Sequence, residues 1–148
     1  MNIKEQKIQK KIKEIRECKG DYQKIHKRLK KKRLSWWKEN KDGLNLKGFL
    51  PRQAYEILFF EYMKLNPKEV PVIYEDNKKI IWQSFNFCPV LEACKKLKLD
   101  TRIVCKEGFE ESVQDFIFCI NPKLKFFRNY RIIRPYEKYC EESIELID

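Results

Sequence analysis

The first 34 residues carry a helical pattern that limits how this end of the chain folds. Apolar side chains recur there at steps of three and four, at Ile8, Ile12, Ile15, Cys18, Tyr22, Ile25 and Leu29. This spacing places them on one face of an α-helix. Gly20 and Asp21 interrupt the pattern with residues typical of a helix C-terminal cap and a helix N-terminal cap. The segment is therefore expected to form one helix or two short helices, and the pattern leaves open whether they pack on the rest of the chain.

Basic charge is concentrated in the same segment. Residues 1–34 contain 14 Lys and Arg against 4 acidic residues, whereas residues 35–148 contain 19 against 18. We therefore divide the chain into a basic amphipathic helical arm, residues 1–34, and a nearly neutral body, residues 35–148. The body is long enough to bury a core of its own.

Helical and strand patterns alternate along the body. A helix is expected after Pro51, and a β-hairpin is expected with its turn at residues 75–78. A further helix begins at Cys88-Pro89, residues 101–105 form a helix or a strand after Asp100, and residues 110–120 form a helix. Residues 122–130 and 141–147 are expected to be two closing strands. The order predicts an α+β fold, with a small antiparallel sheet packed with several helices and preceded by the basic arm.

Composition and motifs indicate where the protein is located and which cofactors it is expected to lack. No apolar run approaches the roughly 20 residues that a membrane span needs, and no export signal follows the start, so we expect a cytosolic protein without a membrane partner. The six cysteines are then expected to be reduced thiols. No CxxC pair occurs, the only histidine is His26 in the arm, and no glycine-rich phosphate loop is present. We expect neither a metal site nor a cofactor.

Cys88 is the first candidate for chemistry. A cysteine at the N-terminal boundary of a helix lies at the positive end of the helix dipole, which lowers the thiol pKa and favours the reactive thiolate. Because the body has no histidine, the candidate bases are Glu92, one turn further along the helix, and Asp100. The alternative is that Cys88 is a small buried thiol in the core.

A second candidate site lies in residues 128–142, which contain three arginines, three tyrosines and three acidic residues. Arginine binds carboxylate or phosphate groups through two parallel hydrogen bonds, and tyrosine supplies a rigid wall and a hydroxyl donor. Arg128, Arg134 and Tyr136 are therefore candidate contacts for a small anionic ligand, and Cys140 is placed to approach Cys88. An ion-paired surface turn is the alternative for this segment.

The basic arm is a candidate for contact with nucleic acid. Clustered basic side chains bind phosphates by releasing counterions, and an exposed tryptophan stacks on bases. The candidates are Lys27, Arg28, Lys30, Lys31, Lys32, Arg33 and Trp36. A solvated helix face, with the tryptophan anchoring the arm to the body, is the alternative.

Four ordered segments resemble the family of L-2-amino-thiazoline-4-carboxylic acid hydrolase. They are FCPVLEACKKLKL, RIVC, INPKLKFFRNY and a YC pair before an acidic closing strand. The resemblance implies a small-molecule pocket in which Cys88, Asp100, Arg102, Cys105 and Cys140 occupy the recurrent positions. The reaction that it implies is hydrolysis of a carbon–nitrogen bond in a small heterocyclic or amide substrate. The long basic arm departs from the core of that family.

A second resemblance runs from about Leu29 to Glu142. The segments KKRLSWWKENKD, SFNFCPVLEACKKLKLDTRIVCK and NPKLKFFRNYRIIRPYEKYCEE are similar to a C-terminal region of some nucleoside deaminases of the cytidine and tRNA-adenosine type. The zinc-binding motifs of the catalytic domain, H-x-E and P-C-x-x-C, do not occur in this chain. The resemblance therefore implies an accessory nucleic-acid-binding or protein-binding module with a deaminase partner and no deaminase activity of its own.

Overall fold

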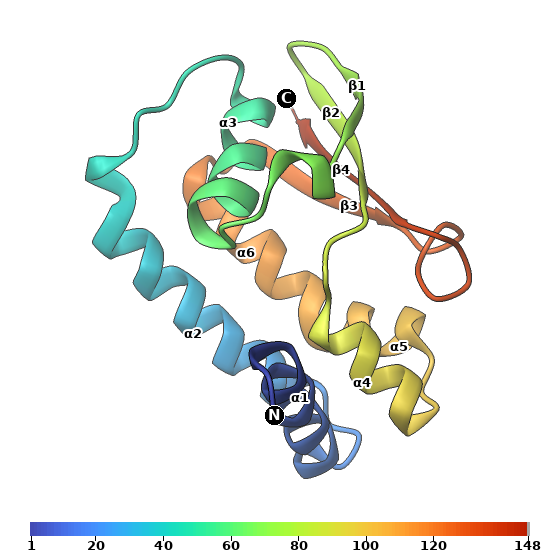
Figure 1. The fold of residues 1–148 in the computed structure, drawn as a ribbon. Coiled ribbons are helices and arrows are strands. Elements are labelled where there is room, and N and C mark those ends of the chain that lie inside the picture. The colour runs from blue at the N-terminus through green and yellow to red at the C-terminus, as the bar shows by residue number, and fades with distance from the viewer. Residues whose placement is uncertain (148) are drawn as a thin grey trace.

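A four-stranded antiparallel sheet and several helices make up the computed structural model, which describes residues 1–147 (Figure 1). The α+β prediction is confirmed. The helices and strands, in chain order, are α1 (Ile3–Cys18), α2 (Gln23–Asn40), α3 (Leu50–Glu56), β1 (Val72–Glu75), β2 (Lys79–Ser84), α4 (Pro89–Leu97), α5 (Thr101–Cys105), α6 (Glu111–Ile120), β3 (Leu124–Asn129) and β4 (Cys140–Leu146). Two π-helical turns, η2 (Ile57–Tyr62) and η4 (Lys106–Glu110), extend α3 and connect α5 to α6.

The strands are ordered β1-β2-β4-β3, and each neighbouring pair is antiparallel. The predicted hairpin is present as β1 and β2. Its turn is held by the Asp76 carboxylate, which accepts hydrogen bonds from the backbone N–H groups of Lys78 and Lys79, both at 2.8 Å. The last strand, β4, inserts between β2 and β3, so the C-terminal segment completes the sheet.

One face of the sheet forms the first hydrophobic core with α3, η2 and α6. Alternate side chains on the strands point into this core, including Ile80 and Trp82 on β2, Phe126 on β3 and Ile144 on β4. This alternation follows from the period of two in an extended strand. Residues of α2 also pack on this core, because Trp36 contacts the ring of Phe116 with centroids 5.9 Å apart.

The basic arm folds back on the body and forms a second core. Its predicted apolar stripe is buried, and Ile8, Ile12 and Ile15 of α1 cluster with Val90 and other buried side chains of α4. The chain breaks between α1 and α2 as one of the two alternatives predicted. Lys19 and Gly20 both have positive φ there, at 50° and 83°.

Two sequence expectations near these elements are revised, and one that was left open is settled. Asp21 does not cap α2, since the N-cap residue is Tyr22 and makes no side-chain capping bond. Helix α2 continues through position 34 to Asn40, so the boundary between the arm and the body coincides with no break in secondary structure. Residues 101–105 are helical rather than extended. Asp100 caps them by accepting a hydrogen bond from the Arg102 N–H at 2.9 Å.

No helix among residues 1–147 combines the length and the apolar composition that would be needed to cross a bilayer.

Candidate ligand-binding pocket

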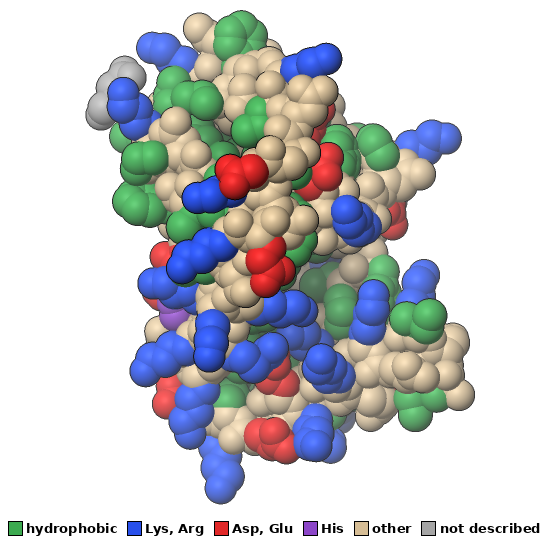
Figure 2. Space-filling view, turned by 90° about the vertical axis from the view of Figure 1, so that its left-hand side faces the viewer, with side chains coloured by type: hydrophobic (Ala, Val, Ile, Leu, Met, Phe, Trp, Pro, Cys, Tyr) green, Lys and Arg blue, Asp and Glu red, His purple; other side chains and the backbone are tan. Residues whose placement is uncertain are grey.

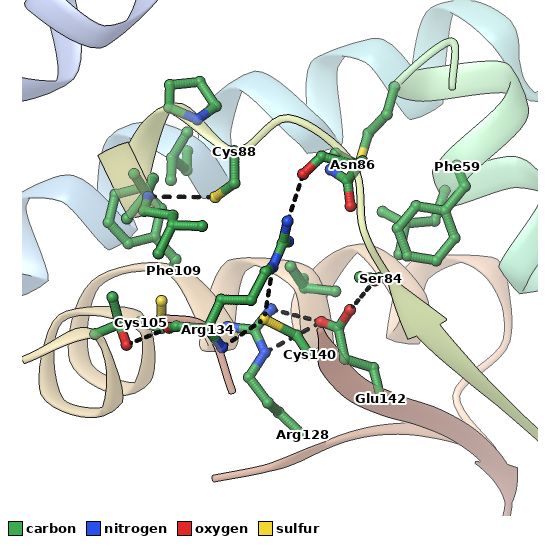
Figure 3. A pocket seen from close by; sticks show the side chains of 18 of the residues that line it. Phe59, Ser84, Asn86, Cys88, Cys105, Phe109, Arg128, Arg134, Cys140 and Glu142 are labelled. Carbon is green, nitrogen blue, oxygen red and sulfur yellow. Dashed lines mark hydrogen bonds and ion pairs between the residues drawn. The ribbon is translucent and has the colours of Figure 1, made fainter. Parts of the chain in front are cut away.

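A cavity of about 280 Å³ lies between the two hydrophobic cores. Apolar side chains from both cores line it, from the sheet, from α2, α4 and α6, and from the two π-helical turns. They include Leu29, Leu58, Phe59, Val90, Phe109, Val113 and Phe126. π-Helical turns are frequent at functional sites, and here they carry two of the aromatic walls, Phe59 and Phe109. Figure 3 shows both rings beside the polar side chains of the pocket.

The charged side chains of the lining are mostly cationic. Its basic residues are Lys11 of α1, Lys32 and Arg33 of α2, Arg128 of β3 and Arg134 of the segment between β3 and β4. Its only carboxylate among the described residues is Glu142 of β4. Arg128 and Arg134 were predicted from the sequence to contact a ligand, and both line this cavity. Lys11, Glu142, Ser84 and Asn86 were missed, and Lys32 and Arg33 were assigned to a different role.

Three thiols, Cys88, Cys105 and Cys140, line the same cavity. Cys88 precedes α4, and its Sγ accepts a hydrogen bond from the Leu91 N–H at 3.4 Å, as a capping residue does. Burial nevertheless raises the pKa of the Cys88 thiol, although this N–H and the nearby charge of Arg134 act in the opposite direction. The lowered pKa expected from the helix dipole is thus corrected, because desolvation of the thiolate outweighs the dipole.

The other two thiols differ in their surroundings. Burial raises the pKa of Cys105 to about 12, so this residue is a neutral thiol at physiological pH. The sulfur of Cys140 accepts hydrogen bonds from both the backbone N–H and the Nε of Arg134, each at 3.4 Å. Figure 3 shows Arg134 extending across the pocket with Cys88 on one side and Cys140 on the other. Cys88 and Cys140 therefore line the same cavity, as expected of residues that approach each other, but Arg134 lies between them.

Arg134 is held in place from both ends. Its Nη1 donates to the backbone carbonyl of Asn86 at 2.7 Å, and its own carbonyl accepts a hydrogen bond from Thr101 Oγ1 at 2.7 Å. Thr101 is buried at the start of α5. No carboxylate of the described residues lies within ion-pair distance of Arg134, so none of them neutralises its charge.

Glu142, in contrast, is fully occupied. Its carboxylate accepts hydrogen bonds from Ser84 Oγ at 2.5 Å, Trp82 Nε1 at 3.3 Å and Arg128 Nη2 at 2.6 Å. This buried network neutralises Arg128. The other cations of the lining form no ion pair with Glu142.

Arg33 is the least satisfied group in the pocket. Its Nη1 donates to the Ser112 hydroxyl, but its Nε is buried and has no hydrogen-bond partner among residues 1–147. Its guanidinium lies over the ring of Tyr62, 6.0 Å from the centroid. Burial lowers the pKa of Arg33, and Arg28 and Arg128 act in the same direction. A buried donor and a buried charge without partners are both costly, which is typical of a site that is completed by a ligand.

Lys11 and Lys32 add to this excess of positive charge. Lys11 forms an ion pair with Glu14 at 3.0 Å, whereas Lys32 is exposed and has no ion-pair partner in the described part of the chain. Partial desolvation and the neighbouring cations lower the pKa of both ammonium groups.

Four predicted site residues lie outside the cavity. Glu92 forms an ion pair with Lys95 at 3.2 Å on α4. Asp100 is bound by Arg102 and Tyr136, and the hydrogen bonds from Arg102 lower its pKa to about 2. Arg102 in turn lies over the Tyr136 ring at 4.3 Å. Pairing of Cys88 with Glu92 or Asp100 as a base is corrected, since neither carboxylate lines the pocket.

The residues predicted to contact nucleic acid fall into three groups, which are packed, ion-paired and unpaired. Trp36 packs on Tyr62 and Phe116, so the expectation that it stacks on bases is wrong. Arg28 forms an ion pair with Glu14, and Lys30 forms one with Asp115 at 3.7 Å. Lys27 and Lys31 are exposed, and the described residues provide neither with an ion-pair partner.

In residues 1–147, no group of three or more His, Cys, Asp and Glu side chains is arranged to hold a metal ion. Comparisons with protein-family models, curated proteins and solved structures gave no match to this chain. The functional assignment therefore depends on the pocket and on the surface of the molecule.

Proposed function

We propose that the cavity binds a small organic anion that has an apolar body and a carboxylate or phosphate group. Arg33 carries this proposal, because its buried Nε lacks a hydrogen-bond partner and no carboxylate of the described residues pairs with its charge. A ligand oxygen would satisfy that donor and neutralise the guanidinium in one step. A charge–charge contact that is shielded from bulk water is stronger than one at the surface.

The size and lining of the cavity support an amphipathic ligand. Its volume of about 280 Å³ is close to the lower end of the range of typical small-molecule sites. Phe59, Phe109 and Phe126 offer apolar contacts, while Arg33, Arg134 and Lys32 offer positive charge. The three thiols add small polarisable surfaces to the lining.

Binding is better supported than thiol-based hydrolysis. The described lining contains no histidine, and Glu142, its one carboxylate, is engaged by Arg128. Cys88 has a raised thiol pKa, so it is a poor nucleophile near neutral pH. Hydrolysis of a cyclic thiazoline, which the family resemblance implies, stays a prediction. It is tested by looking for ring-opened product from 2-amino-2-thiazoline-4-carboxylate, with C88A as the comparison.

The binding proposal is tested by calorimetry with matched probes. We expect benzoate and phenyl phosphate to bind and to raise the Tm, and neutral benzamide, which has the same shape as benzoate, to bind at least tenfold more weakly. Arg33→Gln and Arg134→Gln should each weaken anion binding at least tenfold, because each removes a positive charge from the lining of the site. Arg131→Gln is the matched control, since Arg131 is exposed and lies outside the cavity.

Circular dichroism of each variant separates loss of binding from loss of folding. Equal binding of benzoate and benzamide would overturn the proposal, as would unchanged anion binding in both folded arginine variants. The absence of any Tm shift across a broad set of aromatic carboxylates and phosphates would overturn it as well.

A further inference from the structure

We propose that the outer face of α2, together with the groove between α1 and α2, binds the phosphate backbone of a double-helical nucleic acid. This surface is separate from the pocket, and the proposal goes beyond ligand binding. Figure 2 shows the side of the molecule on which α2 lies, with Lys and Arg side chains gathered over its lower half.

A row of lysines runs along α2. Lys24, Lys27, Lys31 and Lys38, which we call the basic ridge, are separated by three, four and seven residues. At 100° per residue they lie within about 60° of arc, on the side of the helix opposite to the buried Ile25 and Leu29. All four are exposed, and none has an ion-pair partner in the part of the chain that the structure describes. The ridge is thus a row of positive charges without carboxylate partners, with its widest gap between Lys31 and Lys38.

A basic groove adjoins this ridge. It has a volume of about 420 Å³ and lies between α1 and α2, where it is lined by Lys10, Lys13, Glu14, Glu17, Cys18, Lys24, Ile25 and Arg28. The two acidic residues are already paired, Glu14 with Lys11 and Arg28, and Glu17 with Lys13. Lys10 and Lys24 have no carboxylate partner among the described residues, so the groove keeps an excess of positive charge next to the ridge.

The fold fixes the helices that carry these charges. The apolar stripe of the arm is buried in the second core, with Ile12 and Leu29 both under one tenth exposed. Residues 35–148 are nearly neutral, so the positive field is concentrated on one face of the molecule. Because the backbone that carries these lysines is already folded, only their side chains have to be ordered when a polyanion binds.

The composition of this face favours nucleic acid over a membrane surface. A helix that lies on a bilayer inserts large apolar side chains. In α1 and α2, the only exposed large hydrophobic residue is Ile3, far along the chain from the ridge. Repeated free lysines without apolar neighbours instead fit a backbone of evenly spaced phosphates.

The position of the tryptophans favours a duplex over a single strand. Proteins that bind single strands stack aromatic side chains on successive bases. Trp36 and Trp37 both contact the Phe116 ring inside the first core, so neither forms a stacking platform on this face. The ridge and groove therefore contact phosphates and carry no sequence information.

Fluorescence anisotropy with a labelled 20-base-pair duplex of scrambled sequence tests the proposal, with RNA and DNA versions as separate arms. The affinity of the wild-type protein for at least one duplex should fall steeply between 50 and 200 mM KCl. In the triple variant K24Q/K27Q/K31Q the slope of log affinity against log salt should decrease by about 2.7, since each lost phosphate contact removes about 0.9. Glutamine is a good helix former, so these exposed changes should leave α2 folded.

The triple variant K68Q/K78Q/K123Q is the matched control, because it removes three exposed lysines of the body. Its salt slope should equal that of the wild type, and both variants should bind benzoate as the wild type does. Equal loss of affinity in the two triple variants would overturn the proposal. Tighter binding to the single strand, to polyglutamate of matched charge or to phosphatidylserine vesicles would also overturn it. This experiment uses the protein alone and does not test the predicted deaminase partner.

Discussion

Arg128 donates two hydrogen bonds to a single carboxylate oxygen of Glu142, from Nε at 3.1 Å and from Nη2 at 2.6 Å. The two residues are partners across β3 and β4, and their side chains are only 14% and 6% exposed. The pair lies at the sheet end of the pocket, and Glu142, the only carboxylate in the described lining, is neutralised by Arg128. The remaining cations of the lining, Arg33 and Arg134 above all, then face the cavity without an internal counterion.

Breaking this pair should destabilise the protein strongly. Removing one partner of a buried ion pair leaves an uncompensated charge, which costs about 3–5 kcal/mol. We expect Glu142→Gln to lower the free energy of unfolding in urea by about 3 kcal/mol, near the bottom of that range because Gln keeps the shape. Glu145→Gln on the same strand breaks only a half-exposed pair with Lys79 and should cost less than about 1 kcal/mol. Similar losses in the two variants would contradict the structural importance of the Arg128–Glu142 pair.

Asp100 should make stability depend on pH in the acid range. Its folded-state pKa of about 2 lies below the ordinary value of 3.8, so the ionised form favours the folded state. This contribution is fully present above about pH 4 and is lost as the pH falls through 2. Asp100→Asn keeps a good helix cap and removes only the charge. The difference in unfolding free energy between wild type and variant should shrink between pH 4 and pH 2, and a constant difference would count against the Arg102 pairing.

Alkylation should separate the six thiols by exposure and by pKa. Cys119 is the exposed thiol among them and should react first with iodoacetamide in the native protein at pH 8. Cys105, with a pKa of about 12, has about one thiolate in 10,000 at that pH and should react last, together with the buried Cys94. Cys88 should also react slowly, because burial raises its pKa. Mass spectrometry of each cysteine gives the rates, and fast reaction at Cys88 would restore it as a candidate nucleophile.

Trp36 should be a stabilising anchor between the arm and the body. Its ring packs edge to face on Tyr62, with centroids 5.2 Å apart, and also contacts Phe116. Trp36→Ala should lower the free energy of unfolding by about 3 kcal/mol, as expected for truncation of a large aromatic side chain in a core. Ser35→Ala, at the neighbouring exposed position, should change it by less than about 0.5 kcal/mol. Loss of nucleic-acid binding without loss of stability in Trp36→Ala would instead indicate base stacking.

Much of the secondary structure was predictable because its signals are local. Pro51, the Cys88-Pro89 pair and Asp100 mark the starts of α3, α4 and α5, and capping acts over only three or four residues. The turn at residues 75–78 and the alternating strands likewise depend on neighbours in the chain. Local sequence did not reveal that Ile57–Tyr62 continues α3 as a π-helical turn, which shifts Phe59 and Tyr62 into the cavity wall.

These elements, the α+β class and the segregation of basic charge were predictable without a structure, since all three depend on composition or on short-range spacing. The candidate site was not, because it is formed by contacts across the fold. Only the packing of α2 brings Arg33 to the same cavity as Arg134, and only the insertion of β4 beside β3 pairs Glu142 with Arg128. Burial then reversed the expected pKa shift of Cys88, and packing of α2 on the body placed Trp36 against the first core. The physical reason is that desolvation and ion pairing depend on contacts between residues far apart in the chain, and no local pattern encodes those contacts.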